Sequence, residues 1–246
     1  MRLASALLLT ATLASSSSLP STASTDALTG RWMLVQVTES IADLPVVGDA
    51  RNTATATMLF DLDVTGDRLH GPGELCALTL AAKPDLLRPV LPPSYVAAIP
   101  KQQFDGRLHF DDDGVLLETP RAYVVMGAKL ARPLQDPLPK SADDPLVDDT
   151  DRDGKPGVTM LVEGLASAEV YMTSRRYDQM EGRLAAPDRF EGSVRHDQEQ
   201  ELLGSSNALL RVLPPMRPDL ARSRFVMKRV DAGTRCADVA GPRGVQ

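Results

Sequence analysis

Three aspartates recur at every second position in the stretch VDDTDRDGKPGVT, which begins at Val147. A glycine follows the third aspartate, and its backbone permits a sharp turn without a steric penalty. In an extended segment that then turns, alternate side chains can converge on one point, and a backbone carbonyl can add another oxygen. Carboxylate and carbonyl oxygens are the ligands that Ca²⁺ prefers. The spacing therefore predicts a calcium site whose ligands are three carboxylates and one carbonyl, those of Asp149, Asp151, Asp153 and Lys155. A solvated acidic loop that binds no metal is the alternative.

The same stretch resembles the first half of an EF-hand calcium loop and departs from its second half. Counted from Asp149, the twelfth position holds Met160 instead of the bidentate glutamate that completes such a loop. Pro156 and Gly157 also interrupt the helix that should follow, and the next residues, VTMLVEG, predict a strand. A further carboxylate would have to come from outside the motif, where the nearest are Asp143, Asp144 and Asp148. An incomplete ligand set predicts weak, structural binding, with a Kd of about 10⁻⁴–10⁻³ M.

Motifs that mark several enzyme classes are absent from the sequence. It contains no Gly-x-Ser-x-Gly, no His-Glu-x-x-His, no phosphate-binding Gly-Lys-Ser/Thr and no Cys-x-x-Cys. The histidines are scattered, at His70, His109 and His196. We therefore predict no catalytic residue from the sequence, although a site assembled from residues distant in the chain would leave no such motif.

The N-terminus predicts export from the cytoplasm. A short basic start, Met1-Arg2, precedes the apolar run LASALLLTATLA, which is too short to span a bilayer. Serine-rich, small residues follow, as in a cleavage region, so residues 1–24 are expected to be a secretory signal peptide. The mature protein, residues 25–246, is then secreted or periplasmic. Its sequence has no later apolar run long enough for a membrane span. A formal net charge of −6 and the lack of a Lys/Arg cluster argue against a nucleic-acid partner.

The two cysteines, Cys76 and Cys236, are expected to form a disulfide in an oxidising compartment. The pairing would also hold the polar tail DAGTRCADVAG, which has little apolar content to anchor it. Each cysteine could instead be a buried apolar residue.

Short alternating segments bounded by glycine, aspartate and proline dominate the mature sequence. They predict about nine to ten strands, mostly antiparallel, and hence a single all-β domain that is a barrel or a sandwich. Alternation places one face inward in the second strand, and in the hairpin KQQFDGRLHFDDDGVLLETP it places Leu108 and Phe110 inward. The inward face of the second strand comprises Met58, Phe60, Leu62 and Val64.

Three proline-rich stretches predict connections or sheet edges, because proline cannot donate to a central ladder. They are Pro84–Pro100, with a short helix around PPSYVAAI, Pro133–Pro145 and Pro214–Pro218. The second belongs to an acidic Asp/Pro-rich loop at about 132–157, which is the main insertion in the domain.

The first strand of the mature chain resembles the start of the lipocalins and related calycin barrels. Gly30-Arg31-Trp32 matches their Gly-x-Trp pattern, and Trp32 is the only tryptophan. The resemblance implies that this tryptophan closes one end of the barrel beneath an arginine from the last strand. In the segment SRFVMKRV, the matching position is Arg229, which shares a face with Phe225 and Met227. The chain is longer than a simple lipocalin and shows no long helix after the barrel. With its acidic loop, it also looks like secreted bacterial proteins that carry a calcium-type loop.

These features favour a non-catalytic β-barrel protein that binds a small apolar ligand or a cell-envelope component, with calcium as a structural ion. The interior of such a barrel offers an apolar cavity. One alternative is a hydrolase or isomerase with a site assembled from scattered residues. Another is an envelope scaffold that binds only protein. A hollow interior lined by Leu, Met and Phe would favour the first function, and a filled interior with a flat exposed patch would favour the scaffold.

Overall fold

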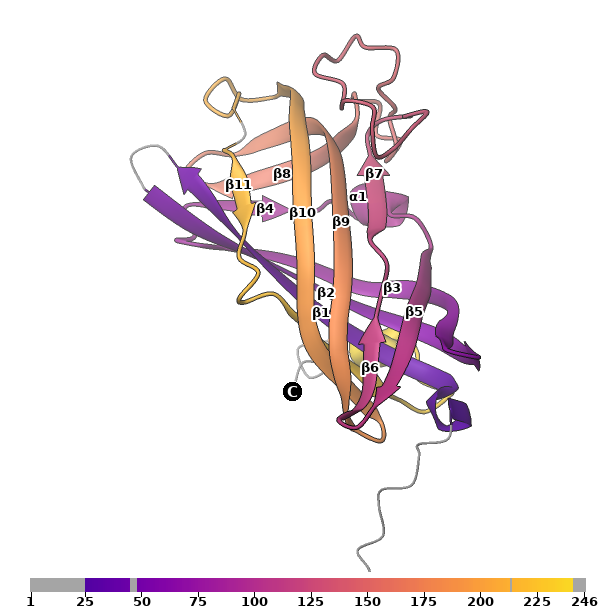
Figure 1. Ribbon diagram of the computed structural model, residues 1–246. Coiled ribbons are helices and arrows are strands. Elements are labelled where there is room, and N and C mark those ends of the chain that lie inside the picture. The colour runs from indigo at the N-terminus through magenta and orange to yellow at the C-terminus, as the bar shows by residue number, and fades with distance from the viewer. Residues whose placement is uncertain (1–24, 45–47, 213, 241–246) are drawn as a thin grey trace, which may run out of the picture.

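The computed structural model describes residues 25–44, 48–212 and 214–240, so the predicted signal peptide at 1–24 lies outside it. The described residues form one large antiparallel sheet of twelve strands, with little helix (Figure 1). The strands are β1 (Gly30–Leu44), β2 (Gly48–Thr65), β3 (Arg68–Lys83), β4 (Leu87–Val90), β5 (Gln102–Asp111), β6 (Gly114–Glu118), β7 (Ala122–Met126), β8 (Val158–Gly164), β9 (Ala168–Ala186), β10 (Arg189–Ser205), β11 (Met216–Pro218) and β12 (Arg224–Arg229). The helical segments are η1 (Thr25–Leu28), α1 (Pro93–Ala98) and α2 (Cys236–Val239). Within this part of the chain, no helix has the length and apolar character needed to cross a membrane.

Eight of the strands close into a ring. Hydrogen-bonded neighbours follow the order β12, β1, β2, β3, β5, β6, β9 and β10, and β10 returns to β12. The antiparallel all-β fold predicted from the alternating segments is therefore confirmed. We call the end of the ring around Trp32, Phe190 and Phe225 the closed end, because all eight strands pair there.

At the opposite end, the neighbouring strands β9 and β10 extend past the ring. β9 pairs with β6 near its C-terminal end, and with β7 and β8 along its N-terminal half. The long connection 127–157 joins β7 to β8 and stands above them in Figure 1. We call this the loop end. β9 and β10, which stand upright in Figure 1, run from the closed end to the loop end, so the two ends share these strands.

The strand count of nine to ten was too low, because two proline-rich segments contain short strands. β4 includes Pro89 and pairs with β8, and β11 ends at Pro218 and pairs with β1. Both lie at edges of the sheet, where a missing N–H does not interrupt a ladder. The helix predicted in the first proline-rich stretch is confirmed as α1, which has a proline in its first turn.

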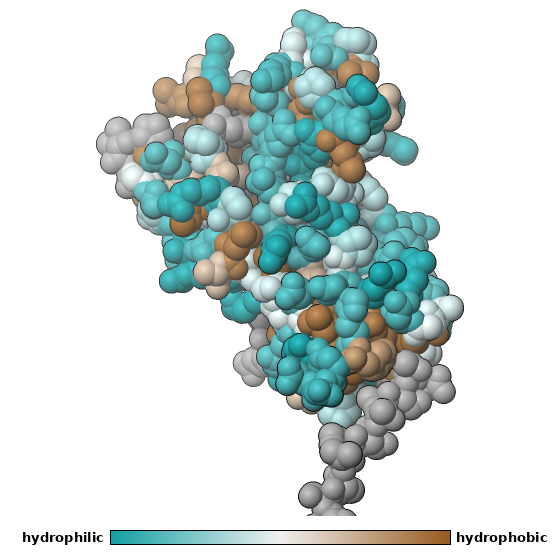
Figure 2. All heavy atoms as spheres, in the orientation of Figure 1, coloured by the Kyte–Doolittle hydropathy of each residue, from teal (hydrophilic) through white to brown (hydrophobic). Residues whose placement is uncertain are grey.

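The closed end is packed by inward-facing side chains of alternating positions. Trp32 and Leu34 on β1 and Phe190 on β10 are essentially inaccessible to solvent. The predicted inward face of β2 is correct, since Met58, Phe60 and Leu62 are buried and Val64 packs against the same cluster. Outward positions of β9 and β10 are polar, and this face of the molecule is mostly hydrophilic (Figure 2). Strand alternation thus separates core from surface.

The prediction for the hairpin of β5 and β6 was half right. Leu108 is buried, whereas Phe110 is 50% exposed. Phe110 shares the face of Leu108, but it pairs with Val115 next to the turn, beyond the edge of the packed core. Alternation fixes the face of a side chain, and the extent of the core decides whether that face is covered.

The predicted disulfide between Cys76 and Cys236 is present, with the two Cα atoms 4.8 Å apart. It joins the short helix α2 to β3, across a sequence separation of 160 residues. The C-terminal tail is thereby fastened to the outside of the ring.

Candidate functional site

A cavity of about 180 Å³ lies inside the sheet, where the packed cluster of the closed end meets a second apolar cluster at the loop end. The second cluster centres on Met126, Val158, Val170 and Met172. Members of both clusters line the cavity, and most of the lining is apolar: Leu34, Met58, Phe60, Leu75, Phe104, Val124, Met126 and Met180.

The polar wall of the cavity comes from the middle of β9. Met172 and Met180 are buried inward-facing residues of this strand. Because side chains alternate, Ser174, Arg176 and Asp178 lie on the same face between them. All three line the cavity. The inner stripe of β9 is therefore apolar at both ends and polar in its middle.

Arg176 and Asp178 form an ion pair on this wall. Nη2 of Arg176 donates to Oδ2 of Asp178 at 2.5 Å. The attraction of the Asp178 carboxylate raises the pKa of Arg176, although burial opposes this, so the guanidinium stays charged. The second carboxylate oxygen, Oδ1 of Asp178, is buried and accepts no hydrogen bond from the described residues. The pair thus keeps one buried acceptor oxygen without a donor.

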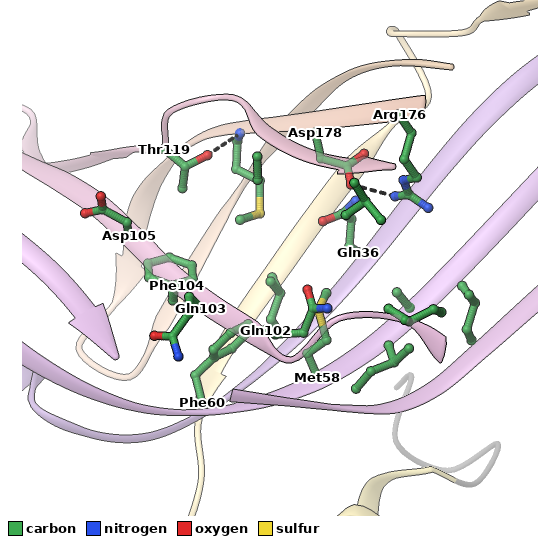
Figure 3. A pocket seen from close by; sticks show the side chains of 18 of the residues that line it. Gln36, Met58, Phe60, Gln102, Gln103, Phe104, Asp105, Thr119, Arg176 and Asp178 are labelled. Atoms are coloured by element: carbon green, nitrogen blue, oxygen red, sulfur yellow. Dashed lines mark hydrogen bonds and ion pairs between the residues drawn. The ribbon is translucent and has the colours of Figure 1, made fainter. Parts of the chain in front are cut away.

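Two further polar groups border the pair. Gln36 of β1 is only 5% exposed and lines the cavity. Tyr95 of α1 lines it as well, and burial raises the pKa of its hydroxyl, which keeps the hydroxyl neutral. In the close view, Arg176 and Asp178 face the cavity with Gln36 beside them, while Phe60 and Phe104 approach from the other wall (Figure 3).

His196 lies beside the pair, as the partner of Asp178 in the β9–β10 ladder. Its Nε2 is 2.9 Å from Oγ of Ser223 and 3.1 Å from the carbonyl oxygen of Glu39. A carbonyl only accepts, so Nε2 carries the proton and donates to both oxygens. Burial lowers the pKa of His196 and keeps the imidazole neutral.

The contact between His196 and Ser223 has the distance of a base and a nucleophile, but its hydrogen bonds have the wrong direction. Ser223 donates its one hydroxyl proton to the carbonyl of Asp219 and accepts from the backbone N–H of Glu39. A base that already holds a proton on the facing nitrogen cannot activate this hydroxyl. We interpret the contact as a clamp between β10, β1 and the segment before β12.

The predicted metal ligands do come together. Asp149, Asp151 and Asp153 each offer a carboxylate oxygen within 4.8 Å of the others. Burial raises the pKa of Asp151, and repulsion by Asp153 and Asp149 adds to the effect. The role of the Lys155 carbonyl stays a prediction; the backbone N–H of Lys155 donates to Asp153 at 2.8 Å.

The carboxylates suggested as extra ligands do not join this group. Asp148 pairs with Nζ of Lys129 at 2.5 Å, and Asp144 accepts a hydrogen bond from the backbone N–H of Leu146. Asp143 is exposed. Among the described residues, the acidic group at this loop therefore consists of three carboxylates.

Trp32 and Arg229 are brought together at the closed end. They are partners in the β1–β12 ladder, and the guanidinium carbon of Arg229 lies 5.0 Å from the centre of the indole. Nε1 of Trp32 donates to the carbonyl of Leu28, and Arg229 donates to the carbonyls of Thr29 and Ala27. These hydrogen bonds hold η1 against the closed end, and neither side chain lines the cavity.

Comparison of the chain with protein-family models and with curated proteins found no match. The resemblance to lipocalins thus rests on the residues at the closed end alone. Arg176, Asp178, Gln36 and Tyr95 were not predicted as site residues. The one signal in the sequence was that the charged residues Arg176 and Asp178 occupy even-numbered positions, as Met172 and Met180 do, and would therefore share a strand face with them.

Proposed function

We propose that the protein binds a small, mostly apolar molecule with one neutral polar head, and that it does so in the cavity beside Arg176 and Asp178. The observation that carries the proposal is the unused acceptor, Oδ1 of Asp178, on the polar wall of a mostly apolar cavity, to which Gln102, Gln103 and Asp105 add polar groups on the other side. A buried carboxylate oxygen without a donor is costly, and a ligand that donates to it removes this cost.

The charge of the wall selects the head group. Arg176 attracts a carboxylate, but Asp178 next to it repels one, and the opposite holds for an amine. A hydroxyl or a carboxamide can accept from the guanidinium and donate to Oδ1 of Asp178 without such a conflict. Because the ion pair has no net charge, it favours an alcohol, a phenol or an amide as ligand over an ion.

The size of the cavity limits the apolar body. A dry cavity of about 150 Å³ accommodates benzene, and the volume of this cavity is about 180 Å³. One ring with a short substituent, or an aliphatic chain of similar volume, fits this space. Of a larger envelope component, only a part could enter the cavity.

The proposal is tested with benzyl alcohol, toluene and benzoate, which share one ring and differ in the head group. Three methionines, Met58, Met126 and Met180, line the cavity, so their ¹³C-methyl NMR signals report occupation directly. Met227 is buried in the closed end and serves as an internal reference. We expect benzyl alcohol to shift the three lining signals at lower concentration than toluene or benzoate.

A cavity-filling variant supplies the control. Ala56 of β2 lines the cavity and packs against the cluster of the closed end, so Ala56→Leu should abolish the shifts. Ala185→Leu adds the same side chain at an exposed position of β9 and should preserve them. The proposal is wrong if the lining signals do not move with any of the three probes, or if Ala56→Leu leaves the shifts unchanged.

The hydrolase or isomerase alternative has weaker support. It needs a base and a nucleophile, or two acidic groups, that face the cavity and are free to act. Asp105 and Asp178 line the cavity, but they form ion pairs with Arg68 and Arg176. His196 is committed to Glu39 and Ser223 through its protonated nitrogen. We accordingly favour binding without catalysis, in which calcium has a structural role.

A further inference from the structure

Three aspartates in the connection between β7 and β8 lie close together without an ionic partner among the described residues. The carboxylates of Asp149, Asp151 and Asp153 offer oxygens that lie within 4.8 Å of one another. None of the three forms an ion pair with a basic side chain of the described residues, whereas Asp148 beside them does. The nearby Lys155 directs its ammonium group to the ring of Tyr171, 5.7 Å from the ring centre.

Neutral hydrogen bonds hold two of the carboxylates in place. Asp149 accepts from the backbone N–H groups of Asp153 and Gly154, at 3.1 and 2.9 Å. Asp153 accepts from the backbone of Lys155 at 2.8 Å and from the hydroxyl of Thr159 at 2.5 Å. These donors orient the carboxylates but bring no positive charge, so the mutual repulsion is not neutralised.

Asp151 provides an independent sign of a missing partner. It is only 7% exposed, and its Oδ2 accepts the backbone N–H of Thr159 at 3.0 Å. Its other oxygen, Oδ1, is buried and has no hydrogen-bond partner among the described residues. A buried carboxylate oxygen without a donor or a cation costs free energy. The chain thus buries one member of an acidic group and leaves an oxygen of it unsatisfied.

We propose that this loop binds Ca²⁺ through the carboxylates of Asp149, Asp151 and Asp153, with the carbonyl of Lys155 and water completing the coordination. Hard oxygen ligands in a flexible set of six to eight suit Ca²⁺, whereas Mg²⁺ keeps more of its water and demands near-octahedral geometry. The position that would carry a completing glutamate holds Met160, on β8. Because only three carboxylates bind the ion and water supplies several ligands, we expect the affinity for Ca²⁺ to be weak.

The metal would fix the loop to the strand that forms part of the cavity wall. The backbone N–H of Gly127, the residue after β7, donates to Oγ1 of Thr150, and the carbonyl of Gly127 accepts from the backbone of Asp148. β7 itself contributes Val124 and Met126 to the cavity. The calcium proposal nevertheless does not depend on the proposed function, because it rests on carboxylates outside the cavity.

The first experiment measures urea unfolding of the full protein by Trp32 fluorescence, in millimolar Ca²⁺ and in chelator, at equal ionic strength. Ca²⁺ that binds only the folded state at a hundredfold excess over Kd raises the folded-to-unfolded ratio about a hundredfold. Asp149→Asn and Asp151→Asn should lose this gain. Asp143→Asn, an exposed acid of the same connection, should retain it.

The sign of the Asp151→Asn effect separates a metal site from a merely structural acid. In chelator, the variant should be at least as stable as the wild type, because it removes an unpaired buried charge. In Ca²⁺, it should be less stable. Terbium luminescence excited through Tyr171, near the loop, provides a second measurement that does not depend on unfolding.

Three outcomes would overturn the proposal. The first is a wild-type protein that shows neither a Ca²⁺-dependent gain nor terbium luminescence. The second is a gain that survives both Asp149→Asn and Asp151→Asn, which would place the metal elsewhere. The third is an equal gain from Mg²⁺, or an equal loss in Asp143→Asn, either of which would indicate general screening of negative charge.

Discussion

The closed end and the loop end share β9 and β10, yet their interiors differ in chemistry. At the closed end, the inner positions are Trp32, Phe190 and Phe225, and every strand of the ring has two neighbours. Towards the loop end, the same inner stripe of β9 becomes polar at Asp178 and Arg176. The closed end can therefore supply the stability that lets the loop end retain a cavity, an ion pair and an acidic cluster.

The largest expected effect lies in the closed end. Phe190 is inaccessible to solvent, and its ring centre lies 5.8 Å from that of Trp32. Phe190→Ala should lower the free energy of unfolding by about 3–5 kcal/mol, through lost burial and the remaining cavity. Urea unfolding measures this loss. Phe110→Ala removes an exposed ring and should cost less than about 0.5 kcal/mol.

Ligand binding sharpens this comparison. In the folded fraction of Phe190→Ala, benzyl alcohol should still shift the methyl signals of Met58, Met126 and Met180. If those shifts disappear while the protein remains folded, the two ends are coupled and the division between them does not hold.

The disulfide should have the next largest effect. Replacing both Cys76 and Cys236 by alanine frees the unfolded chain from a constraint across 160 residues. We expect a loss of about 2–4 kcal/mol in the free energy of unfolding. The Ca²⁺-dependent gain in stability should be unchanged, because the bridge lies outside the acidic loop. A bridge-free variant as stable as the wild type would contradict this prediction and show that the bridge does not stabilise the fold by constraining the unfolded chain.

The features predicted from sequence were local or unique in the chain. A single tryptophan, a single cysteine pair and one run of alternating aspartates each left few arrangements to consider, and the structure brings each set together. The cavity wall was different. Arg175 and Arg176 are adjacent and so face opposite sides of β9. Alternation alone could not tell which one faces inward.

Non-local packing decides between the two arginines. Arg175 lies under the long connection, where it donates to the carbonyls of Pro133 and Asp136. Arg176 faces inward beside Tyr95 of α1, a residue 81 positions earlier in the chain. The ring closure and the strands β4 and β11 depend on similar long-range pairings, which short sequence windows do not contain.

A double replacement on the polar wall should invert the ligand preference. Arg176→Met with Asp178→Leu exchanges the ion pair for apolar side chains of similar length. Such exchanges of buried pairs are often neutral or stabilising, whereas removal of one partner leaves an uncompensated charge. We expect toluene to bind better than benzyl alcohol by about tenfold, which corresponds to about 1.4 kcal/mol. An unchanged preference would mean that the pair does not contact the head group.

The smallest expected effect is the pH dependence from His196, which joins the two ends where β10 meets β1. Burial lowers the pKa of His196 in the folded state, so the folded protein binds fewer protons there than the unfolded chain. Its contribution to stability is complete above the unfolded pKa of about 6.5 and is lost as the pH falls from there through the lower folded pKa. Partial solvent access keeps the slope well below the one-proton limit of about 1.4 kcal/mol per pH unit.

His196→Gln retains a donor for the carbonyl of Glu39 but cannot take up a proton. Between pH 7 and pH 5, its unfolding free energy should therefore fall less steeply than that of the wild type, as measured by urea titrations at each pH. An NMR titration of the imidazole should place the pKa of His196 below 6.5. A titration at or above that value, or equal slopes for variant and wild type, would mean that the imidazole is solvated. The contact of His196 with Glu39 and Ser223 would then be open to water, and the buried packing of the closed end would stop before the cavity.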